Sequence, residues 1–307
     1  MKVLITGASG FLGTALTKFM VGKSVEVTAL SSKDADLRDN KSLERFASQK
    51  YDKIYHLAAW TQAGDFCLYH PGEQWLINQQ INTTVLNWWA QYQRQAKLIS
   101  IGTSCSYEEG SDLREENYLK GIPIADLYVY AMTKRMLQIG IMSLNRQYGM
   151  RYLIVVPSTL YGPGYHVKEK QMHFIFDLAY KILYFKYNGK EVVLWGDGYQ
   201  KRELVFIDDF IKALANLEKK VDNEIVNIGA GEEHTIRDFA GLICEIVGVD
   251  PRSIKYDTSK YVGARSKCLN VEKLNRLLPE RKTRPLREGL EIMVRWIEET
   301  YFKGKKE

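Results

Sequence analysis

The stretch KVLITGASGFLG, residues 2–13, decides the fold of this chain. It reads as a short apolar strand, a turn that carries Gly7, Gly10 and Gly13, and the start of a helix expected over residues 11–20. Glycines in such a turn let the backbone approach a pyrophosphate, and the helix N-terminus offers free N–H groups and a positive dipole. The spacing is a weak signal by itself, but the flanking strand and helix are the required context. The stretch therefore predicts a dinucleotide-binding turn. The alternative is a turn that only packs the helix tightly onto the strand.

The chain continues as an alternation of strands and helices. Further strands are expected at 24–30, 52–60 and 97–102, and the segment 151–164 is expected to be a strand that runs into a Pro/Gly turn. Helices are expected at 40–50, 73–93 and 128–149. This alternation is typical of an α/β fold with a parallel, doubly wound sheet of the Rossmann type. After residue 164 the order is less regular. Helices are expected at 173–185, 236–248 and 287–302, a strand followed by a turn at 192–198, a strand at 223–233, and a strand followed by a helix at 204–217.

The loss of regular order predicts two interleaved units. Residues 1–165, with a return segment at about 204–230, are expected to form the dinucleotide-binding domain. Residues 166–203 and 231–307 are expected to form a smaller C-terminal lobe that binds the substrate.

Composition is that of an ordinary globular protein. The 307 residues, 45% apolar and 26% charged, suffice for one large α/β domain or a domain with an added lobe. The net charge of +6 indicates either a solvated surface or a mild field that favours an anionic ligand such as a nucleotide diphosphate. The sequence has no dense basic stripe typical of nucleic-acid binding and no apolar run long enough to span a membrane. With no signal-peptide pattern, we expect a cytoplasmic protein.

The four cysteines, Cys67, Cys105, Cys244 and Cys268, are far apart in the sequence. No CxxC pair is present, so the sequence predicts no metal site and no disulfide. Cys105 lies in ISIGTSCSYEEG, residues 99–110, where an apolar strand ends in a cluster of hydroxyls. Turn formation explains such a cluster, but a reactive site at the carboxyl end of a strand is the sharper interpretation.

The end of the second strand bears on the cofactor. An acid about 20 residues after the glycine turn commonly holds the ribose hydroxyls of NAD. Here Ser31, Ser32 and Lys33 occupy that place, and no acid occurs before Asp34. Hydroxyls and a lysine suit a 2′-phosphate, so the sequence favours NADP(H). Since no arginine is present there, NAD(H) stays the alternative.

The segment YAMTK places Tyr130 and Lys134 one helical turn apart. A lysine ammonium beside a phenol lowers the pKa of the phenol, which can then exchange a proton with a sugar hydroxyl or carbonyl. The spacing alone is common, and an exposed pair on a helix surface is the alternative. The helix follows the strand that ends at Thr103, which favours the catalytic interpretation.

Several motifs combine at this point: TGASGFLG, HLAA at 56–59, Thr103 four residues before Tyr107, YAMTK, and STLYGPG at 158–164. Together they resemble the extended short-chain dehydrogenase/reductase family of nucleotide-sugar enzymes over almost the whole chain. The resemblance implies that Thr103, Tyr130 and Lys134 form the catalytic group. It also implies a set of cofactor-binding residues: Gly7, Ser9, Gly10, Phe11, Leu12, Gly13, Ser31, Ser32, Lys33, Asp39, Leu57, Ala58, Ala59, Tyr130 and Lys134.

Within that family, TSCSY at 103–107 is similar to the SSCIY segment of the GDP-L-fucose synthases, NADPH-dependent epimerase–reductases of GDP-4-keto-6-deoxymannose. The likeness implies that Cys105 and His173 are catalytic. The implied substrate-binding residues are Ser104, Thr159, Trp195, Arg202 and Lys267. The chain departs from this pattern where Ser9 replaces an arginine that touches the NADP phosphate, where Thr159 replaces an asparagine, and where Asn270 replaces an aspartate.

These resemblances imply an NAD(P)H-dependent reductase of a GDP-4-keto-6-deoxy-sugar that also inverts C3 and C5. One alternative is a nucleotide-sugar 4-epimerase or 4-dehydrogenase with tightly bound NAD, which needs no Cys105/His173 pair. Another is a cofactor-binding regulator without catalysis. Read singly, Cys105 is a small buried hydrophobe and His173 a core histidine, and His166 is a rival for the same role.

Family members commonly form homodimers through the helices that correspond to residues 73–93 and 128–149, and we expect a homodimer here. Trp88 and Trp89 lie in the first of these helices. They belong either to the core of the subunit or to the dimer face.

Overall fold

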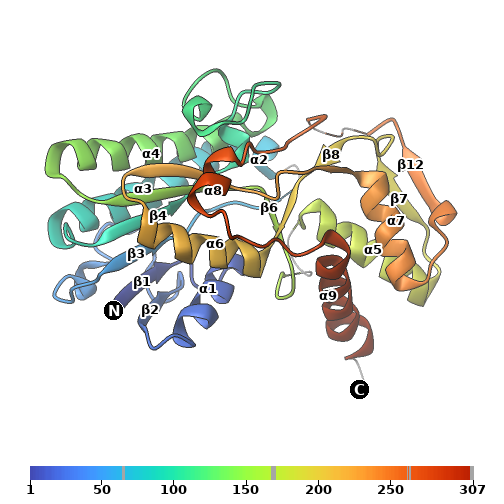
Figure 1. Cartoon of the computed structure of the whole chain (residues 1–307), viewed down its shortest axis with the longest axis horizontal. Coiled ribbons are helices and arrows are strands. Elements are labelled where there is room, and N and C mark those ends of the chain that lie inside the picture. Colours follow the sequence, from blue (N-terminus) through green and yellow to red (C-terminus); the bar gives the residue numbers. More distant parts are fainter. Residues whose placement is uncertain (64–65, 167–170, 261, 263, 305–307) are drawn as a thin grey trace.

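The computed structural model describes residues 1–63, 66–166, 171–260, 262 and 264–304. Its centre is a six-stranded sheet with the order β10-β5-β4-β3-β1-β2, in which every neighbouring pair is parallel (Figure 1). The strands are β1 (Lys2–Thr6), β2 (Glu26–Leu30), β3 (Lys53–His56), β4 (Lys97–Ile101), β5 (Tyr152–Pro157) and β10 (Glu224–Ile228). This is the predicted Rossmann-type sheet.

Most side chains of the central strands are apolar, because helices cover both faces of the sheet. On one face lie α3 (Pro71–Tyr92) and α4 (Tyr128–Tyr148), whose apolar residues pack with Leu4, Ile54 and Leu98. On the other face lie α1 (Phe11–Val21) and α6 (Ile207–Lys220), packed with Val3, Ile5 and Ile99. Both Trp88 and Trp89 are buried in the first of these layers, so they are core residues.

The C-terminal lobe is built on three helices, α5 (Phe174–Asn188), α7 (Ile236–Val247) and α9 (Leu286–Glu298). Strand β7 (Val192–Trp195) pairs with β12 (Ile254–Asp257), and β8 (Lys201–Arg202) pairs with β11 (His234–Thr235). Two further strands, β6 (Thr159–Tyr161) and β9 (Leu204–Phe206), pair with each other where the chain passes between the sheet and the lobe.

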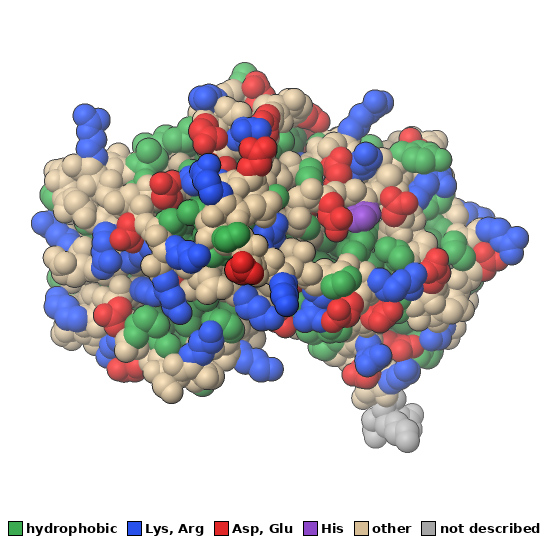
Figure 2. All heavy atoms as spheres, in the orientation of Figure 1, with side chains coloured by type: hydrophobic (Ala, Val, Ile, Leu, Met, Phe, Trp, Pro, Cys, Tyr) green, Lys and Arg blue, Asp and Glu red, His purple; other side chains and the backbone are tan. Residues whose placement is uncertain are grey.

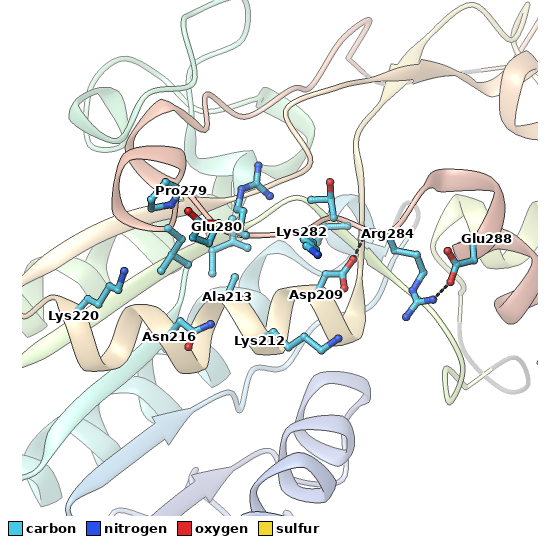
Figure 3. Close-up of a pocket in the computed structure, with 15 residues that line it drawn as sticks. Asp209, Lys212, Ala213, Asn216, Lys220, Pro279, Glu280, Lys282, Arg284 and Glu288 are labelled. Carbon is cyan, nitrogen blue, oxygen red and sulfur yellow. Dashed lines mark hydrogen bonds and ion pairs between the residues drawn. The ribbon is translucent and has the colours of Figure 1, made fainter.

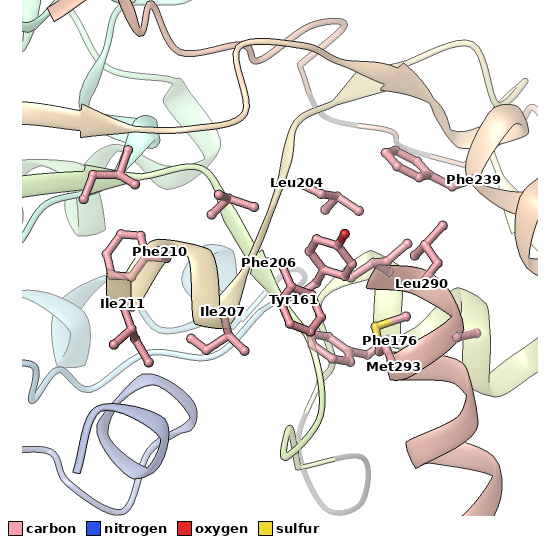
Figure 4. Packing of buried hydrophobic residues seen from close by; sticks show 14 of the residues in the cluster. Tyr161, Phe176, Leu204, Phe206, Ile207, Phe210, Ile211, Phe239, Leu290 and Met293 are labelled. Atoms are coloured by element: carbon pink, nitrogen blue, oxygen red, sulfur yellow. The ribbon is translucent and has the colours of Figure 1, made fainter. Parts of the chain in front are cut away.

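One apolar core runs from the sheet into the lobe. Figure 4 shows Phe210 and Ile211 of α6 close to the β6–β9 junction, with Tyr161, Phe206 and then Met293 of α9 beyond it. The Tyr161 hydroxyl lies against Gly289, where an added Cβ would overlap it. The lobe is therefore packed directly onto the domain.

The shorter elements are α2 (Phe66–Tyr69) and α8 (Glu272–Leu277). There are also 3-10 turns at Glu44–Phe46, Ser104–Ser106, Glu115–Asn117, Ala125–Leu127 and Pro251–Ser253, and a π-helical turn at Glu299–Lys303. Among the described residues, no helix is long and apolar enough to cross a membrane.

Predictions of three elements were wrong. The helix expected at 40–50 is only the turn Glu44–Phe46, because Asp39 accepts the Lys41 amide and closes a local turn. The strand expected at 52–60 ends at His56, and the strand expected at 223–233 ends at Ile228. The segment 151–164 forms two strands, β5 and β6, which are separated at Ser158 before the predicted turn. The segment 192–198 is a strand that ends at Trp195 and then a turn, as predicted, with positive φ at Gly196 and Gly198.

Figure 2 shows the charges of one face of the molecule. Lysine and arginine side chains are interspersed with aspartate and glutamate over both the domain and the lobe. The positive net charge is therefore not gathered into a single stripe on this face.

Candidate active site

The predicted site residues gather at the carboxyl ends of β1, β3 and β4. These strands are neighbours in the sheet, and the chain reverses its direction of travel across the sheet between β1 and β3. Ligands of open α/β sheets bind at such a switch point. The glycine turn, the HLAA segment and the TSCSY segment all follow directly on these strands.

The glycine turn has the geometry that a dinucleotide requires. Gly7 has φ +68°, and a Cβ there would lie 2.7 Å from the Ala58 nitrogen. A Cβ at Gly13 would overlap the Gly7 carbonyl oxygen, so α1 packs against the turn only with glycine at that position. Gly10 caps α1 without any side-chain cap, and Ser9 and Gly10 are exposed. The N-terminal amides of α1 are thus open to a pyrophosphate.

The turn after β2 contains more charge than its sequence indicated. The Ser31 amide and hydroxyl both donate to Asp34, at 2.9 and 2.6 Å, and Ser32 and Lys33 are exposed. The Arg45 guanidinium donates to the Asp34 carbonyl, so the structure brings an arginine to a turn whose own sequence has none. No local pattern could have found Arg45, which lies 11 residues further along the chain.

Asp39, one of the implied cofactor-binding residues, is exposed and accepts the Lys41 amide at 2.9 Å. Leu57, Ala58 and Ala59 form the half-buried start of the loop after β3. The Ala58 amide donates to the Thr6 hydroxyl at 3.3 Å, which ties this loop to β1.

A buried polar network lies behind the glycine turn, and sequence reasoning missed it. His56 Nδ1 is 3.0 Å from the Thr6 hydroxyl, and Nε2 is 3.1 Å from Asn82 Oδ1. Asn82 in turn donates to the Thr133 carbonyl of α4 at 3.4 Å. Burial, assisted by the charge of Lys134, lowers the pKa of His56 to about 4, so the imidazole is neutral. Polar residues on the buried faces of β3 and α3 are the sequence feature from which this network could have been predicted.

Thr103, Tyr130 and Lys134 meet at the end of β4. Thr103 is buried, its hydroxyl accepts the Cys105 amide at 3.3 Å, and it also hydrogen-bonds to the Tyr130 phenol. Lys134 is buried and donates to the Ile101 carbonyl at 3.0 Å. The helix α4 therefore brings both of its site residues to the strand end.

The protonation of this group differs from the sequence-based prediction. Burial raises the pKa of Tyr130, and the neighbouring Cys105 adds to the rise, so the prediction of a lowered pKa was wrong for the protein without cofactor. Burial also lowers the pKa of Lys134 to about 8. The ammonium is directed to the Ile101 carbonyl, which explains why the phenol does not benefit from it.

Cys105 and His173 both lie near Lys267. The Lys267 ammonium is 3.0 Å from Cys105 Sγ. Burial by itself would raise the pKa of the Cys105 thiol, but Lys267, the Thr103 hydroxyl and Arg202 together lower it. His173 caps α5, and its amide donates to the Tyr165 hydroxyl at 3.3 Å.

His173 retains an exposed surface although protein surrounds much of its ring. This desolvation, followed by the charge of Lys267, lowers the pKa of His173, which favours the neutral imidazole. The rival, His166, is exposed, and no interaction described in this part of the chain joins it to Cys105 or Lys267.

The remaining predicted substrate residues surround this group. Ser104 opens the turn that contains Cys105, and Thr159 opens β6. Arg202 donates to the carbonyls of Ala264 at 2.7 Å and Val262 at 3.1 Å. The Val262 side chain packs against Gly196, next to Trp195, whose side chain is 53% exposed. The structure thus brings β7, β8 and the segment that leads to Lys267 together.

Two buried charges that the sequence analysis did not single out hold these segments. Arg135, directly after Lys134, donates to the carbonyls of Ser106, Lys120 and Gly121. Glu203, directly after Arg202, accepts the amides of Gly231 at 2.7 Å and Leu269 at 2.9 Å. Burial raises the pKa of Glu203 to about 7.

A cavity of about 680 Å³ lies elsewhere, between α6 and the segment 278–288 (Figure 3). Asp209 accepts the Arg284 amide at 2.6 Å, and Arg284 also pairs with Glu288. Lys220 donates to the Leu277 carbonyl at 2.9 Å. None of the predicted catalytic residues lines this cavity, so it is not the candidate active site.

Comparison with known proteins agrees with this geometry. A probable GDP-L-fucose synthase 1 from Oryza sativa subsp. japonica is 28% identical over 312 residues, which cover 99% of this chain and 94% of the relative. GDP-L-colitose synthase from Yersinia pseudotuberculosis is 29% identical over 91% of each chain. A crystal structure of a GDP-L-fucose synthetase from Naegleria fowleri bound to NADP has a TM-score of 0.85 at 24% identity, over 98% of this chain and 94% of that one.

The likeness to the Naegleria structure confirms the fold. Residues 3–229 match the family model described as NAD dependent epimerase/dehydratase. This match confirms the resemblance to the extended short-chain dehydrogenases and the prediction of an NAD(P)-dependent enzyme. The chain belongs to the NAD dependent epimerase/dehydratase family.

Proposed function

We propose that the protein reduces a GDP-4-keto-6-deoxy-sugar with NAD(P)H and inverts C3 and C5 of the sugar before the reduction. The observation that carries the proposal is one group of side chains at the carboxyl end of β4. Thr103, Tyr130 and Lys134 provide the reductase machinery there, and Cys105 contacts Lys267, whose charge also acts on His173. The names of the GDP-L-fucose synthase and GDP-L-colitose synthase relatives support the same substrate class.

The residues present fit a nicotinamide dinucleotide. The glycine turn and the open N-terminus of α1 would hold the pyrophosphate, and Lys134 would hold the ribose of the nicotinamide. When bound, the reduced nicotinamide supplies a hydride for C4 of the sugar. We propose NADP(H) over NAD(H), because Lys33 and Arg45 both lie at the turn where a 2′-phosphate would sit.

Tyr130 acts as the proton donor of the reduction. Its raised pKa keeps it a phenol near neutral pH, so it can protonate the oxygen that develops negative charge at C4. The Thr103 hydroxyl donates a hydrogen bond to the same oxygen. Lys134 is still largely charged at pH 7 but donates to the Ile101 carbonyl, so we assign it to holding the ribose and not to lowering the pKa of Tyr130.

Cys105 and His173 act on the carbon atoms beside the 4-keto group, which acidifies the protons at C3 and C5. Inversion needs one group that removes a proton and another that returns one on the opposite face. Cys105, with its lowered pKa, supplies the base. His173 is neutral in the free protein, so it has to take up a proton before it can return one.

We further propose a homodimer formed through α3 and α4, which pack side by side. Both helices expose large apolar residues: Trp75, Leu76 and Tyr92 on α3, and Met136, Ile139 and Met142 on α4. Ile139→Glu should raise the dimer dissociation constant at least about tenfold in sedimentation, whereas Val21→Glu on exposed α1 should not. The four cysteines are free, which supports a reducing compartment such as the cytoplasm.

One incubation in D2O tests the proposed function. The protein is mixed with GDP-4-keto-6-deoxymannose and either NADPH or NADH, and the product is analysed by mass spectrometry and NMR. Reduction of the sugar with deuterium at C3 or C5 supports the full proposal. Reduction of the sugar without deuterium limits the proposed activity to that of a 4-reductase. No turnover with either cofactor contradicts it and favours a 4-epimerase or 4-dehydrogenase with tightly bound NAD.

A further inference from the structure

The contact between Cys105 and Lys267 joins two distant parts of the chain. Cys105 lies in the short turn after β4, and Lys267 lies between β12 and α8, 162 residues later. The ammonium nitrogen is 3.0 Å from the sulfur. This distance is that of a close ion pair or a strong hydrogen bond.

The other charged and titratable groups that act on the thiol are few. Arg202, on β8, is a second cation. Tyr118, Tyr130 of α4 and Cys67 of α2 also face the thiol, and the pKa of each of these three groups is raised, so each is neutral at pH 7. His173, which the charge of Lys267 also reaches, is neutral as well. Cys105 therefore faces two cations and otherwise neutral groups.

The backbone around Lys267 is fixed on both sides. The Lys267 amide and the Ser266 hydroxyl donate to Glu233, and the Leu269 amide donates to Glu203. Arg202 holds the Ala264 carbonyl. Glu233 thus accepts the backbone amide of Lys267 and the Ser266 hydroxyl, and it also pairs with Lys201 at 3.8 Å. The ammonium of Lys267 is directed to the sulfur instead.

We propose that Lys267 is a positioning residue that keeps Cys105 as a thiolate in the free protein and serves as its counterion. The thiol proton passes to solvent, and the resulting thiolate is ready to accept a proton from the substrate. The use of this thiolate rests on the proposed function, but its existence does not. Lys267 thereby acquires a role beyond the predicted contact with substrate.

Alkylation without substrate tests this inference. The rate at which iodoacetamide modifies Cys105 is measured by peptide mass spectrometry from about pH 5 to about pH 10, because only the thiolate reacts. Lys267→Met should move the midpoint of the rate upward by at least about one pH unit, which slows alkylation at pH 7 about tenfold. Lys267→Arg should restore most of the rate. Lys201→Met, which also removes a lysine that neighbours Glu233, should leave the rate unchanged.

An unchanged midpoint in a folded Lys267→Met protein would overturn the inference. A second measurement covers the case in which that variant does not fold. The thiolate absorbance of the wild-type protein, minus that of Cys105→Ser, should rise with a midpoint below the ordinary thiol value of about 8.5. A midpoint at or above that value contradicts the inference. Since neither assay contains substrate, the thiolate pair can stand even if the D2O experiment shows no turnover.

Discussion

The two ends of the central sheet carry buried charges that are arranged in opposite ways. At the amino ends of the strands, the Lys97 ammonium donates to the carbonyls of Glu218, at 2.7 Å, and Val221, and lies 2.8 Å from Asp222. Lys53 lies 2.8 Å from Glu218, which also accepts the Tyr55 hydroxyl. Two cations therefore face two anions, and the three donors of Lys97 all have acceptors.

At the carboxyl ends of the strands, the cations have hydrogen-bond donors without an acceptor among the described residues. Within the described part of the chain, Lys134 has one hydrogen-bond acceptor, the Ile101 carbonyl, and Lys267 has one at its ammonium, the Cys105 sulfur. Arg202 adds a third positive charge. The amino-end cluster of Lys53, Lys97, Glu218 and Asp222 is here called the saturated cluster, and it stabilises the sheet. The carboxyl-end cluster of Lys134, Arg202 and Lys267 is called the unsaturated cluster, and it is available to an anionic ligand such as a nucleotide diphosphate.

The largest expected effect breaks the saturated cluster. Lys97→Met leaves the carbonyls of Glu218 and Val221 without this donor, at a cost of about 1–3 kcal/mol for each buried acceptor left unsatisfied. Asp222, whose side chain is 43% exposed and also lies 3.9 Å from Arg151, adds little to the loss. Urea unfolding of the variant should show this loss. Lys255→Met, which breaks the exposed pair with Glu191, should cost less than about 1 kcal/mol. Equal losses of unfolding free energy in the two variants would contradict the contrast between the saturated cluster and an exposed surface pair.

The next effect concerns the region of the unsaturated cluster and should leave the free energy of unfolding unchanged. Tyr130→Phe removes the proposed proton donor, so kcat should fall about a thousandfold. The melting temperature and the affinity for NADPH should stay close to those of the wild type. Tyr128→Phe, at an exposed position two residues before Tyr130 in the first turn of α4, should keep full activity. A fall of less than tenfold for Tyr130→Phe would remove the phenol from the mechanism.

Cys105→Ser separates the two halves of the proposed reaction. Incorporation of deuterium at C3 and C5 should fall about a hundredfold, since a serine hydroxyl is a poor base. Reduction of a 4-keto sugar that already has the inverted configuration should continue. Loss of both activities in parallel would mean that Cys105 supports the site structurally. NMR of the product formed in D2O distinguishes these results.

The smallest effect depends on pH and concerns His56, which lies between Thr6 and Asn82 at the carboxyl ends of the strands. Its pKa is about 4 in the folded protein, below the unfolded value of 6.5, so its stabilising contribution is present above pH 6.5. As the pH falls from 7 to 5, the unfolded state takes up a proton that the folded state refuses, and stability should drop by about 2 kcal/mol. His56→Gln should remove this part of the pH dependence in urea unfolding. An unchanged dependence would contradict the neutral buried imidazole.

Local sequence patterns predicted the parts of the site that follow directly on strands. The glycine turn, Thr103 at the end of β4 and the Tyr130/Lys134 pair on α4 all depend on spacing of a few residues. The contact of Lys267 with Cys105 depends on how the lobe folds back, and only the family likeness placed both residues near the substrate. Arg45, Arg135 and Glu203 were missed because each bonds to backbone carbonyls or amides, which leave no mark in a motif.

The helix predicted at 40–50 failed for a related reason. A segment of this length forms a helix only when an apolar face holds its successive turns against the rest of the protein. Leu43 is buried here, and the turns after it form only Glu44–Phe46. Trp88 and Trp89 are buried in the core, so they are not part of a dimer face. The exposed apolar residues of α3 and α4 are then the surface available for pairing with a second subunit.

The shared core at the β6–β9 junction has a consequence for how this protein can be divided. The edge strand β10 and the covering helix α6 both come from the return segment, and Tyr161 is pressed against Gly289 of α9. A fragment that stops at residue 165 would lack an edge strand of its sheet and expose the apolar side of α1. The two halves are therefore one folding unit, which should melt in a single calorimetric transition and resist being cut into independently expressed parts.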